Sequence, residues 1–432
     1  MRNGNYERTT CCVVGGGPAG MMLGFLLARS GVRVTVLEKH ADFFRDFRGD
    51  TVHPSTLELF FELGLLDKFL KVPHQKIASV GGVFGDFPFT AADFRRVRTR
   101  CQFVALMPQW DFLNFVAGEA RRFPNFNLEL EHEATDLVSE EGRIAGVELK
   151  SPSGTGIVYA DLVVACDGRE SVLRQRAGLE VMDSSVPVDV LWFRISREQG
   201  DAEDVLGRVN FGKALILINR GDYFQAGLIV RKGSFGQIQR DGLERFREDV
   251  VRIAPFLKGR AEELRGWDQV KLLTVRINRL RKWYRPGLVC IGDAAHAMSP
   301  AGGVGINLAI QDAVAAARIV AGALRERGST DRLLPKIQRR RELPTRVTQF
   351  FQMRAHIAFA RVFDNPGPLE APWQLKTVMR IPGAQRLLGH LVGVGVRPEH
   401  IRKQAPHRLV RFACGLGVGL ALVGWPRRRT AL

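Results

Sequence analysis

The sequence predicts an α/β fold with an inserted mixed-sheet domain and a helical C-terminal region. Three observations predict it: a glycine-rich turn separates an apolar strand from a helix near residue 15, residues 186–233 alternate apolar and polar side chains, and the residues after 330 follow a helical period. The 432 residues suffice for two or three domains. A hydrophobic share of 45% with 25% charged residues is typical of a globular protein.

The turn near residue 15 has the spacing of a dinucleotide-binding βαβ unit. Residues 11–14 read as a buried strand, residues 19–29 as a helix, and residues 32–37 as a second strand followed by Glu38. The turn and the helix start contain Gly15, Gly17, Pro18, Ala19 and Gly20. In this G-x-G-x-x-G pattern the first glycine allows the tight turn, the second admits a pyrophosphate, and the third lets the helix pack on the strand. Helix amides then face the phosphates.

Glu38 narrows the choice of nucleotide. It stands eighteen residues after Gly20, where an acid accepts hydrogen bonds from the ribose hydroxyls and repels a 2′-phosphate. The pattern therefore predicts FAD or NAD, not NADP. We expect the next residue, Lys39, to neutralise a phosphate on the adenine side or to stay solvated.

A second glycine cluster, in residues 289–313, favours FAD. FAD is much longer than the adenosine pyrophosphate that one βαβ unit holds, so it needs a distant second site. Residues 288–291 read as a strand that leads to Gly292 and Asp293, and this carboxylate can bind a ribityl hydroxyl. The helix that follows presents free amides at residues 303–305 to the pyrimidine edge of a flavin. From these residues alone, a plain helix start with a capping aspartate remains the alternative.

At these motifs the sequence resembles the flavin-dependent aromatic hydroxylases of the para-hydroxybenzoate hydroxylase type, the group A flavoprotein monooxygenases, which include ubiquinone-pathway hydroxylases. The resemblance rests on GGGPAG with Glu38, on VVACDGRESVLRQ (163–175) and on GDAAHAMSPAGGVGINLAIQDA (292–313). It covers residues 9–175 and 283–325, somewhat less than half of the chain. Gly24 stands where the family often has Ala, and Lys39 where Arg is common.

The resemblance implies a Rossmann-like FAD-binding domain. The motifs and the resemblance together assign the following residues to the cofactor: Gly15, Gly17, Pro18, Ala19, Gly20, Glu38, Lys39, Arg48, Gln109, Asp167, Gly168, Gly292, Asp293, Pro300, Gly303, Val304, Gly305 and Asn307. Arg48 matches the family's flavin-side arginine, and Gln109 matches its glutamine near the ribityl phosphate. Asp167 and Gly168 form the Asp-Gly motif, which the family uses near flavin and nicotinamide.

The domain order follows from these assignments. We expect the FAD-binding domain to comprise residues 1–180 and 281–330, a substrate-binding sheet domain to span 181–280, and a helical region to span 331–432. The candidate pocket residues are Trp192, Arg194, Phe211, Tyr223 and Gln225. For each of them an ordinary place on the sheet is the alternative. Arg194 is singled out because a cation beside aromatic rings can hold a phenolate or carboxylate.

The chemistry that the resemblance implies is hydroxylation of a phenolic, quinol or prenylated aromatic substrate. NADH or NADPH would reduce FAD, dioxygen would add at flavin C4a, and the distal oxygen of that hydroperoxide would pass to the ring. The sequence contains no second G-x-G-x-x-G after a strand, so the reductant would bind transiently. His53 and His296 are the acid–base candidates, with a hydrogen-bonding role in the turns as the alternative. No metal-type spacing is present.

The charge of the chain bears on its partners. A net charge of +18 attracts anions, but the cations are spread along the chain without a nucleic-acid module, so we expect no nucleic acid. The cysteine pattern and the lack of an apolar leader before the first strand predict a reducing, cytoplasmic location.

The C-terminal residues leave two interpretations open. The apolar run at 412–425 ends in Trp425 and precedes three arginines, and its fourteen residues are too few to span a bilayer. It is either a buried terminal helix or a peripheral contact with the inner face of the membrane through residues 409–429.

Three other functions are alternatives for this sequence. A flavin halogenase shares two of the motifs, but its W-x-W-x-I-P signature is absent. A geranylgeranyl-type reductase would use the same FAD site on a prenyl substrate without coupling NAD(P)H oxidation to oxygen uptake. A flavin-binding membrane scaffold would bind FAD that no nicotinamide reduces.

Overall fold

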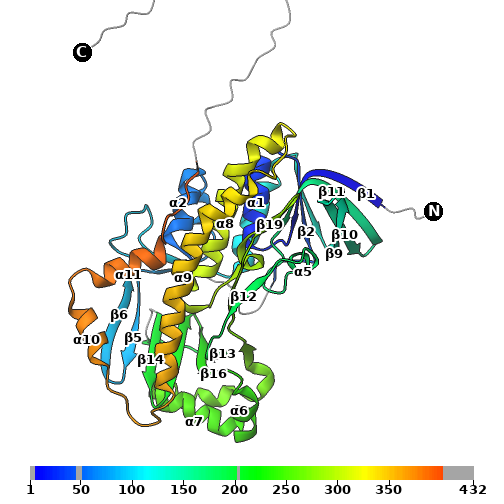
Figure 1. The fold of residues 1–432 in the computed structure, drawn as a ribbon. Helices are drawn as coiled ribbons and strands as arrows, with labels where there is room; N and C mark the ends of the chain where they lie inside the picture. Colours follow the sequence, from blue (N-terminus) through cyan, green and yellow to red (C-terminus); the bar gives the residue numbers. More distant parts are fainter. Residues whose placement is uncertain (1–4, 45–50, 202–204, 402–432) are drawn as a thin grey trace, which may run out of the picture. The chain divides into compact units, whose positions relative to one another are not determined.

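The computed structural model describes residues 5–44, 51–201 and 205–401 (Figure 1). Arg48 and the apolar run at 412–425 lie outside the described residues. The expectations for both therefore remain predictions.

The first sheet carries the glycine-rich turn. Its strands lie in the order β19-β20-β11-β1-β2-β8, and β10 and β9 extend it from β11. The pairs from β20 to β8 are parallel, whereas β19, β10 and β9 pair antiparallel. The strands are β1 (Asn5–Val14), β2 (Val34–Glu38), β8 (Phe126–Leu130), β9 (Glu133–Glu140), β10 (Arg143–Ser151), β11 (Gly154–Ala165), β19 (Tyr284–Arg285) and β20 (Leu288–Cys290).

Both faces of this sheet are covered, as a parallel sheet requires. Helices α1 (Pro18–Arg29), α4 (Gln109–Ala120) and α8 (Val304–Arg325) bury one face in the largest core cluster. The β9–β10 hairpin packs on the other face. By length and composition α8 could cross a membrane, but most of it is buried in the fold, where it packs on α1. Its apolar character is explained by the core.

The second sheet is the predicted mixed sheet. Its order is β17-β13-β16-β15-β14-β5-β6, and β14 with β5 is its parallel pair. Because β5 and β6 precede residue 181, two separate stretches of chain build this sheet. Helices α6 and α7 bury one of its faces (Figure 1). These elements are β5 (Ser79–Phe84), β6 (Phe87–Asp93), β13 (Val188–Ser196), β14 (Val205–Asn210), β15 (Lys213–Asn219), β16 (Tyr223–Arg231), β17 (Lys271–Leu273), α6 (Phe235–Asp241) and α7 (Leu243–Ile253).

A long helix, α9 (Leu334–Val362), links the two sheets. It packs against α8 beside the first sheet and reaches β15 of the second sheet (Figure 1). The remaining elements are β3 (Thr51–Val52), β4 (Gln75–Ile77), β7 (Val104–Leu106), β12 (Val181–Ser184), β18 (Ile277–Leu280), β21 (His296–Ala297), α2 (Pro54–Glu62), α3 (Leu66–Phe69), α5 (Val172–Arg176), α10 (Trp373–Arg380), α11 (Ala384–Gly393) and the 3₁₀ turns Pro255–Leu257, Ala261–Glu263, Trp267–Gln269, Gly292–Ala294 and Ala301–Gly303.

Candidate functional site

The glycine-rich turn follows the carboxyl end of β1. Gly15 has a φ of 106°, and a Cβ added to it would lie 2.4 Å from the carbonyl oxygen of Cys166. A Cβ at Gly20 would lie 1.9 Å from the carbonyl oxygen of Gly15. At Gly17, by contrast, no atom of the described residues beyond its neighbours in the chain lies within 4 Å of the Cβ position. The turn is closed by protein at its first and third glycines and open at the second, where a pyrophosphate would approach.

Glu38 lies beside this turn at the end of β2. Its Oε2 accepts a hydrogen bond from the Gly16 amide at 2.9 Å, and its Oε1 accepts one from the His40 amide at 3.1 Å. The side chain is largely buried, whereas Lys39 is exposed. These bonds hold the carboxylate against the turn, the position that an acceptor for ribose hydroxyls needs.

Three motifs that are far apart in the sequence meet at this turn. Gly15 lies against the backbone of Cys166 and Asp167, which directly follow β11. A Cβ at Gly292 would lie 3.1 Å from the Cβ of Ala19 at the start of α1. Arg169 of the Asp-Gly motif donates from Nε to Oδ2 of Asp293 at 3.0 Å. The fold therefore brings the G-x-G-x-x-G, Asp-Gly and Gly-Asp motifs into one site.

Asp167 is partly unsatisfied. Its Oδ2 accepts from the Leu173 amide at 3.2 Å, but its buried Oδ1 has no hydrogen-bond partner among the described residues. Burial raises the pKa of this carboxyl. Gly168, next in the chain, has a φ of 86° and open space at its Cβ position. An enclosed acceptor beside an open backbone is suited to a polar ligand group.

The start of α8 forms the other side of the site. Pro300 leads into the turn, and Gly302 and Gly303 have φ values of 77° and 61°. A Cβ at Gly303 would lie 2.2 Å from Oγ1 of Thr51, which donates to the Gly303 carbonyl at 2.9 Å. Only glycine allows this close approach. Val304 and Gly305 form the first turn of α8.

Family membership follows from the comparison with known sequences. The profile of the family described as "FAD binding domain" matches residues 8–351. The chain belongs to this family. Its open Gly17, the Glu38 carboxylate and the unpartnered Asp167 oxygen fit FAD, so geometry and family agree on the cofactor.

Characterised relatives define the reaction type. The chain is 31% identical to 6-methylpretetramide 4-monooxygenase of Streptomyces rimosus over 82% of this chain and 86% of that protein. It is 24% identical to para-nitrophenol 4-monooxygenase of Pseudomonas sp. strain WBC-3 over 82% and 89%. The protein is an FAD-dependent monooxygenase, as the resemblance predicted. This function is supported over the reductase and halogenase alternatives.

Solved structures confirm the fold. PqsL of P. aeruginosa with 2-aminobenzoylacetate superposes with a TM-score of 0.71 at 21% identity, covering 83% of this chain and 100% of PqsL. The p-nitrophenol 4-monooxygenase PnpA of Pseudomonas putida gives 0.69 at 20% identity, with 89% and 94% covered. The myxobacterial halogenase CndH gives 0.70 at 21% identity, with 90% and 97% covered. Since the same fold carries different chemistries, these likenesses show the fold alone.

Two predicted site residues of the flavoprotein form hydrogen bonds within the protein. Asn307 Oδ1 accepts from the His53 amide and from Thr56 Oγ1, while its Nδ2 donates to the carbonyls of Thr51 and Gly303. The His53 ring donates from Nδ1 to the carbonyl of Val392 at 2.8 Å. Burial lowers the pKa of His53 to about 4. Asn307 therefore ties residues 51–56 to α8, and His53 is a neutral turn residue.

His296 belongs to a buried ionic cluster. Its Nε2 lies 2.6 Å from Oδ2 of Asp312, which also accepts from the Gly292 amide at 3.1 Å. Arg341 of α9 donates to the other carboxylate oxygen at 2.8 Å. Burial opposes ionisation of Asp312, but the His296 ring and Arg341 outweigh it and lower the pKa of Asp312. The cluster fixes the turn that carries Asp293.

Helix α9 also holds the loop that precedes α8 in place through hydrogen bonds. Gln352 accepts from the Ser299 amide and donates to the carbonyls of Ser299 and Ala301. His356 bonds Oγ of Ser299 at 2.7 Å, and Gln349 donates to the carbonyl of Ala297. Burial and, secondarily, the charge of nearby Lys232 lower the pKa of His356. Buried polar groups of α9 thus position the backbone around Pro300.

Four of the five predicted pocket residues share one face of the second sheet. In the register of β13 and β16, Trp192 pairs with Gly227, Arg194 with Gln225, and Ser196 with Tyr223. Their neighbours Phe193 and Phe224 face the α6–α7 side, so Trp192, Arg194, Tyr223 and Gln225 face the opposite side. The Arg194 guanidinium lies 5.0 Å from the centre of the Tyr223 ring. The predicted pairing of a cation with an aromatic ring is present.

Phe211 and Gln109 lie apart from this group. Phe211 occupies the turn between β14 and β15 with a φ of 51°, and Arg252 of α7 lies 4.6 Å from its ring centre. Phe211 therefore lies in a hairpin turn and not on the sheet face where the alternating pattern predicted it. Gln109 is the first residue of α4, and it is half-buried.

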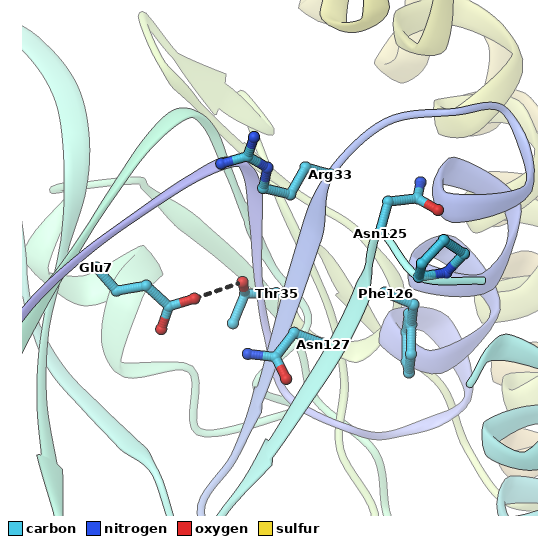
Figure 2. Close-up of a pocket in the computed structure, with 7 residues that line it drawn as sticks. Glu7, Arg33, Thr35, Asn125, Phe126 and Asn127 are labelled. Atoms are coloured by element: carbon cyan, nitrogen blue, oxygen red, sulfur yellow. Dashed lines mark hydrogen bonds between the residues drawn. The ribbon is translucent and has the colours of Figure 1, made fainter. Parts of the chain in front are cut away.

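A hollow of about 430 Å³ lies away from the flavin site. It is lined by Glu7, Arg33, Thr35, Pro124, Asn125, Phe126 and Asn127 (Figure 2). These residues lie toward the amino ends of β1, β2 and β8, where Thr35 donates to Glu7 at 3.2 Å. Cofactors of open parallel sheets bind outside the carboxyl ends, which is where the three glycine motifs meet.

Several residues of the site were missed by the sequence interpretation. Arg169 and Asp312 lie inside the second and third motifs, so a charged side chain within a motif was a usable signal. Arg341 and Gln352 had no such signal, because nothing in the sequence separates them from the many other polar and basic residues of their helix.

Proposed function

We propose that this monooxygenase hydroxylates a phenolic, quinol-type or prenylated aromatic substrate, with dioxygen as co-substrate and NADH or NADPH as a transient reductant. The observation that carries the proposal is the meeting of the three motifs around the open backbone at Gly17. The names of the two relatives, which refer to a pretetramide and to a nitrophenol, support an aromatic substrate.

Within this function each motif has a definite task. Glu38 would hold the ribose, the main chain at Gly17 would face the pyrophosphate, and Asp293 would exchange its bond with Arg169 for a ribityl hydroxyl. The amides at the start of α8 would stabilise negative charge on the pyrimidine edge. Bound FAD supplies the oxygen-activating chemistry, and the protein supplies binding, orientation and exclusion of water.

Substrate recognition would depend on the face that carries Trp192, Arg194, Tyr223 and Gln225. Arg194 over Tyr223 provides a cation beside an aromatic ring, an arrangement that favours a phenolate or a carboxylate. Arg220 donates to Gln225 Oε1 at 2.9 Å, which adds a second cation on the same side.

The test is a screen of phenols, quinols and aromatic acids against the FAD-loaded protein. A substrate should stimulate NADH or NADPH oxidation together with oxygen uptake, and mass spectrometry should show a product heavier by one oxygen atom. Stimulated oxidation without oxygen uptake would contradict hydroxylation and favour a reductase.

We further propose a cytoplasmic location with peripheral contact to the inner face of the membrane through residues 409–429. Support comes from the apolar run that ends in Trp425 and three arginines. Deleting residues 409–432 should lower the share of the protein in the membrane fraction, and an unchanged share would refute this contact.

A further inference from the structure

Between residues 341 and 357, helix α9 buries several polar side chains and exposes apolar ones, whereas the apolar residues Leu334, Ile337 and Val362 near its two ends are buried. Its buried face carries Arg341, Gln349, Gln352 and His356, which bond the ionic cluster and the loop before α8. Its outer face exposes Leu343, Phe350, Phe351 and Ile357, with exposed fractions of 50%, 55%, 51% and 42%. A helix that packs on a core normally has the reverse distribution. The fold therefore leaves these four apolar side chains exposed within the described structure.

The outward residues form one line, which we call the α9 stripe. It consists of Arg339, Leu343, Arg346, Phe350, Arg354, Ile357 and Arg361. Residues three or four positions apart share one face of a helix, so cations and apolar side chains alternate along it. All seven side chains are exposed, and Arg354 lies 5.3 Å from the ring centre of Phe350. No acidic residue belongs to the stripe, and within the described residues its four arginines form no ion pair.

We propose that the α9 stripe binds an anionic lipid surface. Leucine, phenylalanine and isoleucine side chains would enter the boundary between headgroups and acyl chains, while the arginines contact lipid phosphates. A second copy of the chain fits worse, because two stripes would place arginine against arginine. Residues 402–432 also fit worse, since they carry seven Lys or Arg and no Asp or Glu. The net charge of +18 favours the same anionic partner.

The experiment measures binding of the full-length, FAD-loaded protein to vesicles. Vesicles of phosphatidylcholine with phosphatidylglycerol should sediment the protein, and vesicles of phosphatidylcholine alone should not. Arg346→Gln with Arg354→Gln should lower the partition coefficient about 30-fold. Phe350→Ser with Ile357→Ser should lower it about tenfold or more. Both pairs are exposed, so FAD content and circular dichroism should stay unchanged.

Matched controls remove the same groups elsewhere. Lys258→Gln with Arg265→Gln removes two exposed cations near α7, and Leu272→Ser removes an apolar side chain that is 43% exposed on β17. Neither control should lower the partition coefficient by more than about twofold.

Three results would overturn the proposal. The first is that the stripe variants partition as the wild type does, which would assign all binding to residues 409–429. If the proposal is correct, the stripe substitutions should also lower binding in a protein that lacks residues 409–432. The second is self-association that the stripe variants abolish without any vesicle binding, which would assign the stripe to a second copy. The third is a wild-type protein that binds neither kind of vesicle.

Discussion

Glycines of the flavin site differ in whether protein atoms occupy the space where a side chain would lie. Gly20 is filled, because a Cβ would lie 1.9 Å from the carbonyl oxygen of Gly15, whereas Gly17 faces open space within the described structure. A side chain at Gly20 would therefore disturb the fold. A side chain at Gly17 would disturb only what binds there.

Gly17→Val tests this distinction. Gly17 has a φ of −73° and extended backbone, which valine adopts easily. We expect the unfolding midpoint of the apoprotein to stay unchanged, while the Kd for FAD rises about 100-fold through loss of about two charge-assisted hydrogen bonds. Fluorescence titration with FAD measures the change. Gly118→Ala, at an open position in α4, is the control and should bind FAD normally.

His53 predicts a pH dependence of stability. Burial lowers its pKa from 6.5 in the unfolded chain to about 4 in the fold. The unfolded state therefore takes up the proton first, and the contribution of His53 to stability is lost as the pH falls from about 6.5 toward 4. Between pH 7.5 and pH 5 this loss amounts to about 2 kcal/mol.

Urea unfolding of the FAD-saturated protein at the two pH values measures this term. His53→Gln should reduce the difference between the two free energies of unfolding by about 2 kcal/mol. His390→Gln, in an exposed position on α11, should leave the difference unchanged. An equal difference in His53→Gln and wild type would show that another group is responsible.

At the scale of elements, α9 connects the two sheets and controls the loop before α8. Its glutamines satisfy main-chain groups of residues 297–301 that the small strand β21 leaves unpaired. This explains how a turn with two left-handed glycines keeps one conformation. The position of Pro300 thus depends on a helix that follows it in the chain by more than thirty residues.

Gln352→Met tests the clamp. Methionine keeps the volume but loses three hydrogen bonds, which leaves buried main-chain groups of Ser299 and Ala301 unsatisfied. We expect the free energy of unfolding to fall by about 2–4 kcal/mol and amide exchange to accelerate in residues 299–303. Gln374→Met, exposed on α10, should change stability by less than about 0.5 kcal/mol. Normal exchange in the loop of Gln352→Met would contradict the clamp.

At the scale of the whole molecule, the site is formed by three turns that follow neighbouring strands of the first sheet. The turns after β1, β11 and β20 lie at the same edge because these strands are adjacent and parallel. One ligand that spans this edge should therefore affect all three turns together.

Removing FAD tests this arrangement. Amide exchange should rise in residues 15–20, 166–169 and 292–305 of the apoprotein, and the turn between β14 and β15, which lies in the second sheet, should exchange as before. The unfolding midpoint should fall, since saturation at 100 times Kd contributes about 2.7 kcal/mol. Hydrogen exchange with mass spectrometry follows all segments at once. A rise confined to residues 15–20 would mean that the other two motifs do not contact the cofactor.

The sequence by itself determined the α/β class and the glycine-rich turn, because glycines at fixed intervals, an acid after the second strand, and alternation along strands are readable without knowing what lies nearby. The helix predicted at 19–29 is observed at Pro18–Arg29 for the same reason. The FAD cofactor and the monooxygenase family were implied by the resemblance of its motifs to the aromatic hydroxylases.

Only the tertiary structure decided which polar residues serve the site from within. Asn307 lies in the third motif yet bonds to protein, as the acid–base candidate His53 does, whereas Arg341 and Gln352 act at the site from positions that no local pattern marks. A hydrogen bond depends on the distance between two side chains, and the packing of α9 across the molecule sets those distances. The spacing of residues in the sequence does not predict that packing.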